Sequence, residues 1–258
     1  ISVFLCFFLN KIFKKLDLID QIKKRKIHNK STPFSGGTIL IILYLYMIAN
    51  SNYNQGLEEI IIISFFVFVI GMLDDVKELS PLNKIILLTF PILFLIINNN
   101  YIVSDFGTYE IIGNINIKKL GIIFTFLSII LFINAYNYID GIDGLALMHF
   151  LIFLIYYYII LDDIKVTNFL ILMMIPTLIV LLFNLISVET LKVFIGNNGS
   201  LTIGFIMSFF SIFINLKQHL HPVLIIWPLS LITYDFISVN IFRLNKHANI
   251  FTPNKNDH

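Results

Sequence analysis

The chain has 258 residues, of which 57% are hydrophobic and 13% are charged. A soluble globular domain has about 45–50% apolar and about 25% charged residues, so the composition excludes an ordinary soluble domain and predicts an integral membrane protein. The formal net charge of only +2 gives no reason to expect a nucleic-acid partner. The single cysteine, Cys6, excludes a disulfide framework and a cysteine-based metal site.

Apolar runs divide the chain into candidate membrane spans. A spanning helix needs about 20 mainly apolar residues, or somewhat fewer where its ends reach the interface. By that criterion the sequence predicts an all-α, polytopic membrane protein with about nine spans. We expect a single transmembrane domain over residues 1–258, incomplete at both ends. The spans are predicted at residues 1–13, 36–50, 58–73, 82–98, 120–138, 144–161, 168–186, 200–216 and 222–242. Between the fourth and fifth spans, residues 98–119 alternate weakly and predict a small hairpin.

Positive charge distinguishes the two sides of the membrane. Of the 18 Lys and Arg residues, only four lie in connections after even-numbered spans, namely Lys118, Lys119, Lys165 and Lys217. Cytoplasmic loops carry the excess of Lys and Arg, so the connections after odd-numbered spans are predicted to be cytoplasmic. Every candidate motif described below lies on that side.

The most distinctive segment runs from Asn134 to residue 146, between two apolar runs. Asn134, Asn137, Asp140 and Asp143 follow one another at steps of three. Each step of three rotates the side-chain direction by about 60° on an α-helix, so a straight helix cannot direct all four to one ligand. The glycines at 141 and 144 favour a helix that ends near Asp140 and another that begins near Gly144, with the carboxylates in the turn. The alternative is a polar turn without chemistry, but polar groups at membrane depth are usually functional.

A second acidic segment lies at the end of the third span, where Asp74 and Asp75 are followed by Lys84. Adjacent carboxylates at a helix end can hold a divalent cation or accept a proton, and a lysine about ten residues later can reach a phosphate. The alternative is an acidic pair placed where a helix meets water.

Three further segments lie on the same side. Residues 193–200, with Gly196, Gly199 and Ser200, form a glycine-bracketed turn before a span, and amides at a helix N-terminus suit an anion; an ordinary helix cap is the alternative. Residues 23–37 are basic, with Arg25 and His28, and part of that charge is expected to fix topology near anionic lipid. The tail from residue 243 to His258 includes Lys255.

Together these segments resemble the bacterial polyprenyl-phosphate N-acetylhexosamine-1-phosphate transferases, and more distantly the phospho-MurNAc-pentapeptide translocases. The resemblance covers essentially the whole chain, and the match over residues 134–146 is the most specific. It implies a Mg²⁺-dependent reaction, for which Mn²⁺ could substitute. In that reaction the phosphate of undecaprenyl phosphate attacks the β-phosphate of a UDP-N-acetylhexosamine and releases UMP. Clustered carboxylates and lysines suit this chemistry, because phosphoryl transfer depends mostly on positioning and charge neutralisation.

The resemblance also implies roles for individual residues. Asp74 and Asp75 would act at the acceptor phosphate, with Asp75 a proposed base, while Asp140 and Asp143 would serve nucleotide or metal. Asp74, Asp143 and Asn197 are the expected metal ligands. The expected substrate contacts are Lys84, Asn134, Asn137, Arg25, His28, Gly199, Ser200, Lys255 and His258.

The chain departs from the family pattern in two places. Asn197 stands where the family usually has a metal-binding Asp, so one negative charge is missing, although an amide oxygen can still coordinate a hard cation. His258 is one residue out of step with the usual C-terminal histidine run.

The sequence therefore predicts a multi-pass transferase of the bacterial cytoplasmic (inner) membrane, with its active site facing the cytoplasm. Its expected partners are undecaprenyl phosphate, a UDP-N-acetylhexosamine (GlcNAc by preference) and membrane lipid; a homodimer is left open. Three alternatives remain. They are a phospho-MurNAc-pentapeptide transferase, a paralogue that binds prenyl phosphate or nucleotide sugar without catalysis, and an ion-coupled transporter. The transporter is disfavoured because its sites would lie near the midplane of the membrane.

Overall fold

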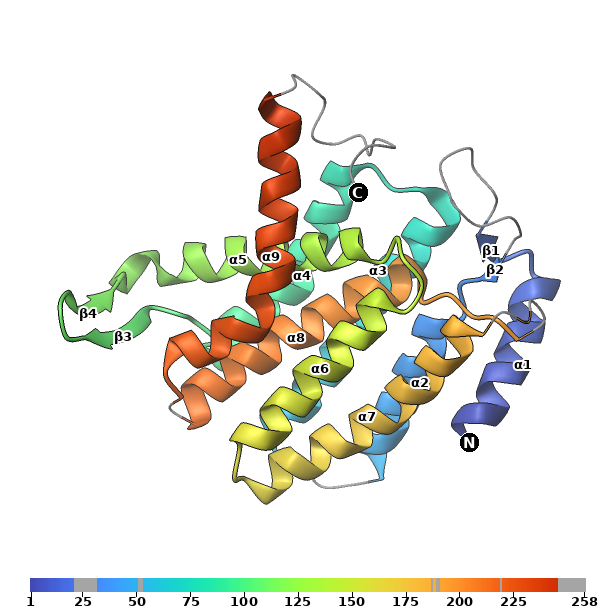
Figure 1. Cartoon of the computed structure of the whole chain (residues 1–258), viewed down its shortest axis with the longest axis horizontal. Helices are drawn as coiled ribbons and strands as arrows, with labels where there is room; N and C mark the ends of the chain where they lie inside the picture. The colour runs from blue at the N-terminus through green and yellow to red at the C-terminus, as the bar shows by residue number, and fades with distance from the viewer. Residues whose placement is uncertain (21–31, 51–52, 187, 189–190, 219, 246–258) are drawn as a thin grey trace.

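The computed structural model describes residues 1–20, 32–50, 53–186, 188, 191–218 and 220–245. Within these residues the chain forms a bundle of nine α-helices with two short antiparallel hairpins and one 3₁₀ turn (Figure 1). The helices are α1 (Ser2–Lys15), α2 (Gly36–Ala49), α3 (Gln55–Lys77), α4 (Pro81–Asn99), α5 (Gly121–Ile139), α6 (Leu145–Ile160), α7 (Ile164–Leu185), α8 (Gly196–Gln218) and α9 (Pro222–Asn245). The hairpins pair β1 (Ile19–Asp20) with β2 (Thr32–Pro33) and β3 (Asp105–Tyr109) with β4 (Gly113–Asn116), and η1 (Lys118–Leu120) precedes α5.

Each predicted span corresponds to one of these helices, and the all-α, polytopic prediction is confirmed. Six helices are long and apolar enough to cross a membrane, whereas α2 and α6 are shorter apolar helices and α1 has only 14 residues. The number of nine spans is therefore not confirmed. The predicted hairpin in residues 98–119 is present as β3 and β4.

The centre of the bundle is α8. It packs against α2, α3, α5, α6 and α9, and 89% of its apolar stretch is buried. Glycines allow the close approaches on which this packing depends. A Cβ added at Gly71 of α3 would lie 2.5 Å from the Cα of Asn198, and one at Gly204 of α8 would lie 3.1 Å from the Cβ of Tyr136. Small residues permit such contacts between helices in a membrane, so the sequence of α8 suits a helix surrounded by protein.

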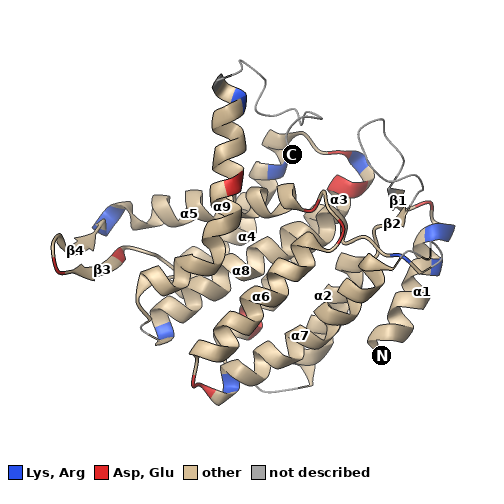
Figure 2. Ribbon diagram, in the orientation of Figure 1, with Lys and Arg blue, Asp and Glu red and all other residues tan. Residues whose placement is uncertain are grey.

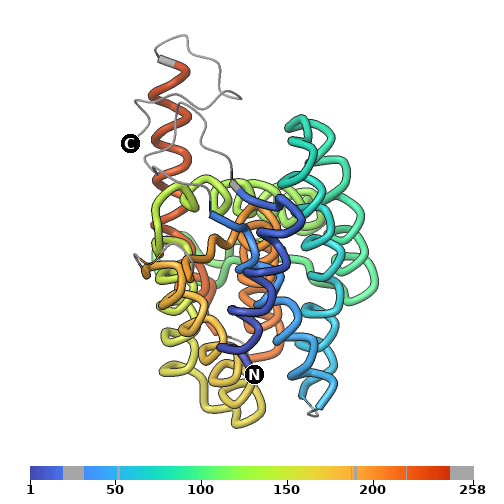
Figure 3. The backbone as a smooth tube through the Cα atoms, turned by 90° about the vertical axis from the view of Figure 1, so that its right-hand side faces the viewer, coloured from blue at the N-terminus to red at the C-terminus, as the bar shows by residue number. Residues whose placement is uncertain are grey.

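In contrast, α9 lies at the periphery and rises beyond the end of the bundle, as Figures 1 and 3 both show. Only 11% of its apolar stretch is buried. Most charged residues lie near helix ends and in connections, and the apolar middle of the bundle is largely free of them (Figure 2). This distribution is expected for a multi-pass membrane protein, because a charge in the hydrocarbon region is costly.

Two helix boundaries matter for the site. The third helix continues to Lys77, so Asp74 and Asp75 lie in its last turn and not in the loop beyond it. The eighth begins at Gly196, so residues 196–199 form its first turn and not a separate loop. Both carboxylates and the α8 amides are thereby held on regular secondary structure.

Candidate active site at the N-terminus of α8

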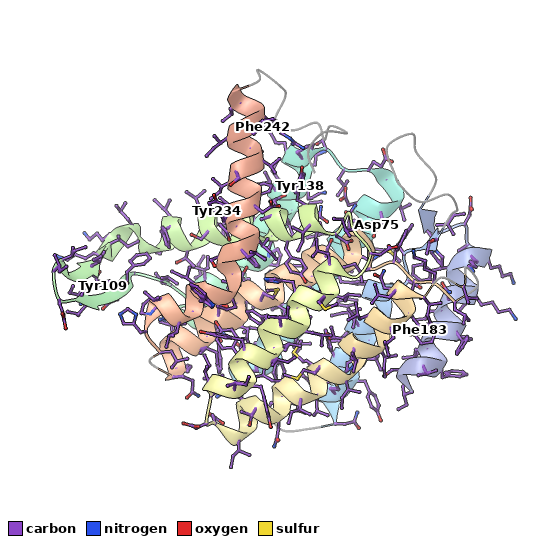
Figure 4. The ribbon with its side chains drawn as sticks, viewed as in Figure 1. Asp75, Tyr109, Tyr138, Phe183, Tyr234 and Phe242 are labelled. Carbon is purple, nitrogen blue, oxygen red and sulfur yellow. The ribbon has the colours of Figure 1, made fainter. Side chains whose placement is uncertain are left out.

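The first turn of α8 receives an anion, and that anion is the side chain of Asp75. The Asp75 Oδ1 accepts a hydrogen bond from the backbone N–H of Asn197 at 2.9 Å. Its Oδ2 accepts two more, from the backbone N–H of Asn198 at 2.9 Å and from Asn198 Nδ2 at 2.7 Å. A helix N-terminus favours negative charge because its first N–H groups have no partner within the helix. The amides of the predicted turn thus bind Asp75, labelled in Figure 4, and the binding of a substrate anion there stays a prediction.

The neighbouring carboxylate, Asp74, is oriented differently. It is buried, with 4% of its side chain exposed, and its Oδ2 lies 2.5 Å from the Nζ of Lys84. Its Oδ1 accepts a hydrogen bond from the backbone N–H of Leu79 at 2.9 Å, which fixes the connection between α3 and α4. A buried carboxylate needs such compensation. Lys84, expected to contact phosphate, is therefore paired with Asp74 in this structure.

The segment at residues 134–146 adopts the predicted arrangement. The fifth helix ends at Ile139, Asp140 caps its C-terminus and α6 begins at Leu145, after Gly144 in the left-handed conformation with φ of 76°. Asp143 lies in the turn, and its Oδ2 is 2.5 Å from the Nζ of Lys192. From its sequence position alone, Lys192 is one of the positive charges in the connections predicted to be cytoplasmic. No spacing rule could have predicted its pairing with a residue 49 positions earlier.

The two asparagines of that segment have different surroundings. Asn137 Oδ1 accepts a hydrogen bond from Ser200 Oγ at 2.5 Å, which joins α5 to the second turn of α8. Asn134 Nδ2 donates to the carbonyl of Ile130 within its own helix. The structure thus joins Asn137 to α8 but shows no comparable link for Asn134 among the described residues.

The segment after β2 completes this end of the bundle. Phe194 N–H donates to the carbonyl of Pro33, and Gly36 N–H donates back to the carbonyl of Phe194 at 2.8 Å. Gly37 packs directly on Gly199, because a Cβ at either position would lie too close to the backbone of the other. Gly199 is buried in this contact, and its expected role at substrate stays a prediction.

Four of the predicted site residues fall outside the described residues, namely Arg25, His28, Lys255 and His258. Their expected roles at substrate are neither supported nor opposed by the geometry. The described motif segments nevertheless converge: α3, α5, the α5–α6 turn and the α7–α8 loop all meet around the first two turns of α8.

The fit of a metal ion to the expected ligands differs from residue to residue. Among the described residues, no three His, Cys, Asp or Glu side chains are grouped so that they could hold a metal ion. Asp74 is buried, with its Oδ1 bonded to Leu79 N–H and its Oδ2 paired with Lys84, so its expected role as a metal ligand stays a prediction. Asp143, with 27% of its side chain exposed, and the partly exposed Asn197 offer the oxygen ligands that Mg²⁺ prefers.

Comparison with known proteins identifies the family. The family model described as "Glycosyl transferase family 4" matches residues 57–215, which cover all of α5 and most of α3 and α8. This chain belongs to glycosyl transferase family 4. The matched region contains Asp74, Asp75, Asn137, Asp143, Lys192 and Ser200.

Several named relatives are similar to this chain over most of its length. The undecaprenyl-phosphate alpha-N-acetylglucosaminyl 1-phosphate transferase of Escherichia coli O157:H7 is 27% identical, over 99% of this chain and 73% of its own length. A probable undecaprenyl-phosphate N-acetylglucosaminyl 1-phosphate transferase of Bacillus subtilis is 26% identical, over 79% of this chain and 57% of its own length. The phospho-N-acetylmuramoyl-pentapeptide-transferase of Thermotoga neapolitana is 27% identical, over 92% and 80%. Together with the apolar helices, these matches make the chain a multi-pass membrane member of a transferase family.

Proposed function

We propose that this family 4 member transfers N-acetylhexosamine 1-phosphate, with GlcNAc the expected sugar, from a UDP-sugar to undecaprenyl phosphate. An oxygen of the prenyl phosphate bonds to the β-phosphorus of the donor. The bond from that phosphorus to the oxygen bridging it to the α-phosphorus breaks, and UMP leaves with the bridging oxygen. We further propose that residues 1–258 act as one transferase domain in the bacterial cytoplasmic (inner) membrane.

One observation supports this proposal most directly. The first two turns of α8 lie among carboxylate, lysine and amide side chains. These come from segments up to 126 positions apart in the sequence, from Asp74 to Ser200. In phosphoryl transfer the protein mainly positions the reactants and neutralises developing charge. Lys84 and Lys192 supply positive charge at this end of the bundle, each held in place by a carboxylate.

The hydrogen bonds of Asp75 support a positioning role. A phosphate monoester has a second pKa near 6, so the acceptor is mostly a dianion at pH 7 and can attack without losing a proton to the protein. Asp75 instead holds the first turn of α8 through three hydrogen bonds. We therefore propose that Asp75 positions the α8 segment next to the substrates, and its role as a base stays a prediction.

A metal ion is part of the proposal. Mg²⁺, or Mn²⁺ in its place, would be held by Asp143 and the amide oxygen of Asn197 and would offset phosphate charge. Lys192 now occupies one oxygen of Asp143, so the metal and the lysine would share that carboxylate.

Substrate identity can be measured with membranes that contain the protein. Undecaprenyl phosphate and a panel of radiolabelled UDP-sugars are supplied, and labelled lipid is extracted. We expect UDP-GlcNAc to give the most product. The Thermotoga relative favours a second candidate, UDP-MurNAc-pentapeptide, and lipid labelling from that donor alone would replace the first. Binding without lipid labelling from any donor would favour the non-catalytic paralogue.

The metal proposal predicts the effect of Asn197→Asp. A carboxylate binds a hard cation better than an amide, and unit charges about 4 Å apart attract by about 4 kcal/mol at an effective dielectric of 20. Part of that attraction is lost to desolvation. We expect the Mg²⁺ concentration for half-maximal turnover to fall by roughly tenfold, which corresponds to about 1.4 kcal/mol.

The matched control is Asn83→Asp, which adds a negative charge on the exposed first turn of α4. It should leave the Mg²⁺ requirement unchanged. Equal shifts in both variants would show a general charge effect, and no shift in Asn197→Asp would remove Asn197 from the metal site.

The proposed orientation predicts which loops are accessible from outside the cell. The native Cys6 is buried, and Lys77 and Lys165 are exposed on opposite sides of the bundle by the predicted topology. With an impermeant thiol reagent added to intact cells, Lys165→Cys should be labelled and Lys77→Cys only after permeabilisation. Labelling of Lys77→Cys in intact cells would place the carboxylates on the outer side.

A further inference from the structure

One buried side chain connects the two loops that supply Asp143 and Lys192. Asn184 lies in the last turn of α7, and 4% of it is exposed. Its Oδ1 accepts a hydrogen bond from the backbone N–H of Gly144 at 2.5 Å. Its Nδ2 donates to the backbone carbonyl of Val193 at 2.7 Å. Gly144 directly follows Asp143, and Val193 directly follows Lys192.

The surroundings of Asn184 make these contacts specific. A Cβ added at Gly144 would lie 2.6 Å from Leu185 Cδ2, so the backbone of the turn rests against the end of α7. Val193 N–H donates to the carbonyl of Phe183 at 3.3 Å, a second link to the same helix end, where Figure 4 labels Phe183. A buried amide requires partners for both its oxygen and its nitrogen, and Asn184 obtains one from each loop.

We infer that Asn184 is a positioning residue for the transfer reaction. Asn184 sets the distance between the Asp143 carboxylate and the Lys192 ammonium. It acts through the backbone of the two residues that follow them. The inference rests on the proposed function, because it assigns Asp143 and Lys192 to the site. Its structural part, that Asn184 holds the Gly144 turn and the Val193 loop together, can be measured without any substrate.

The test compares Asn184→Leu with Thr177→Val. Leu keeps the branch at Cγ, is larger than Asn, and removes both hydrogen bonds. The control removes a buried side-chain hydrogen bond from the same helix, the one between Thr177 Oγ1 and Tyr44 Oη at 2.6 Å, about two turns before Asn184. We expect kcat of Asn184→Leu to fall by roughly 10- to 100-fold, the scale of displacing a catalytic group by about an ångström. Thr177→Val should stay within about twofold of wild type.

A double-mutant cycle separates positioning from general destabilisation. If Asn184 acts through the pair, Asn184→Leu combined with Lys192→Met should have nearly the kcat of the worse single variant. Independent effects would multiply instead. A folded Asn184→Leu with wild-type kcat, or a double variant whose losses multiply, would overturn the inference.

Amide hydrogen exchange gives a readout that needs no activity. In the detergent-solubilised full chain, peptides that contain Gly144 and Val193 should exchange about tenfold faster in Asn184→Leu and at the wild-type rate in Thr177→Val. If Asn184→Leu does not fold, Asn184→Asp retains an acceptor for Gly144 N–H, and only the Val193 side should loosen. If the wild-type protein shows no transferase activity but Asn184→Leu still exchanges faster, the proposed function is refuted and the structural link stands. Unchanged exchange in both Asn184 variants would overturn the inference itself.

Discussion

Asp75→Asn is expected to lower turnover by on the order of 10²-fold or more and to lower the thermal stability of the protein as well. The amide that replaces the carboxylate has one acceptor oxygen in place of two. In either orientation its NH₂ group faces an N–H donor of α8, from Asn197 or from Asn198, and that hydrogen bond is lost. Hydrogen bonds to a charged group contribute about 1.5–3 kcal/mol. Loss of this anchor displaces the first turn of α8 and the segments packed around it.

The measurement is turnover together with the melting temperature of the purified protein in detergent. Asp162→Asn serves as the control, since Asp162 is an exposed carboxylate at the opposite end of the bundle. It should change neither quantity. An Asp75→Asn protein that loses turnover but melts like wild type would favour the base role over the positioning role. Wild-type turnover would refute both.

Asp143→Asn is expected to reduce turnover by a similar factor, on the order of 10²-fold, with little change in stability. The Asp143 and Lys192 side chains are 27% and 19% exposed. Partly exposed ion pairs contribute roughly 0–1 kcal/mol to stability. Their charges should matter more to a phosphate substrate than to the fold.

The same two measurements distinguish this result from the Asp75 result. Turnover should fall in both variants, but only Asp75→Asn should lower the melting temperature clearly. Lys192→Met should also lower turnover, as Asp143→Asn does, since it removes the ammonium group paired with that carboxylate. Near-wild-type turnover of Asp143→Asn would reduce the turn at residues 140–144 to a structural element.

Patterns local in the sequence predicted much of this structure. Each of the nine apolar runs forms a helix among the described residues. In lipid the backbone N–H and C=O groups of an apolar stretch must bond to one another, and a helix satisfies them within the segment. The break between α5 and α6 followed from the glycines at 141 and 144, and Gly144 takes the left-handed conformation that such a turn requires. These features depend on residues only a few positions apart.

Contacts between residues far apart in the chain could not be predicted from the sequence. Asp75 bonds to residues more than 120 positions later, and Lys192 pairs with Asp143 across 49 positions. Asn184 gave no signal, because one Asn in an apolar run is compatible with several roles. The glycine-bracketed turn lies at the N-terminus of a helix, as its sequence indicates. That its amides bind a carboxylate of the same chain depends on how α3 packs against α8.

The central claim is the transfer of a sugar together with its phosphate. UDP-GlcNAc labelled with ³²P at the β-phosphate and with ³H in the sugar is given to membranes that contain the protein and undecaprenyl phosphate. Our account predicts that both labels enter the lipid in the ratio of the donor and that unlabelled UMP remains in the water phase. Lipid that contains ³H without ³²P, with labelled UDP in the water, would contradict it, because the sugar alone would then have been transferred.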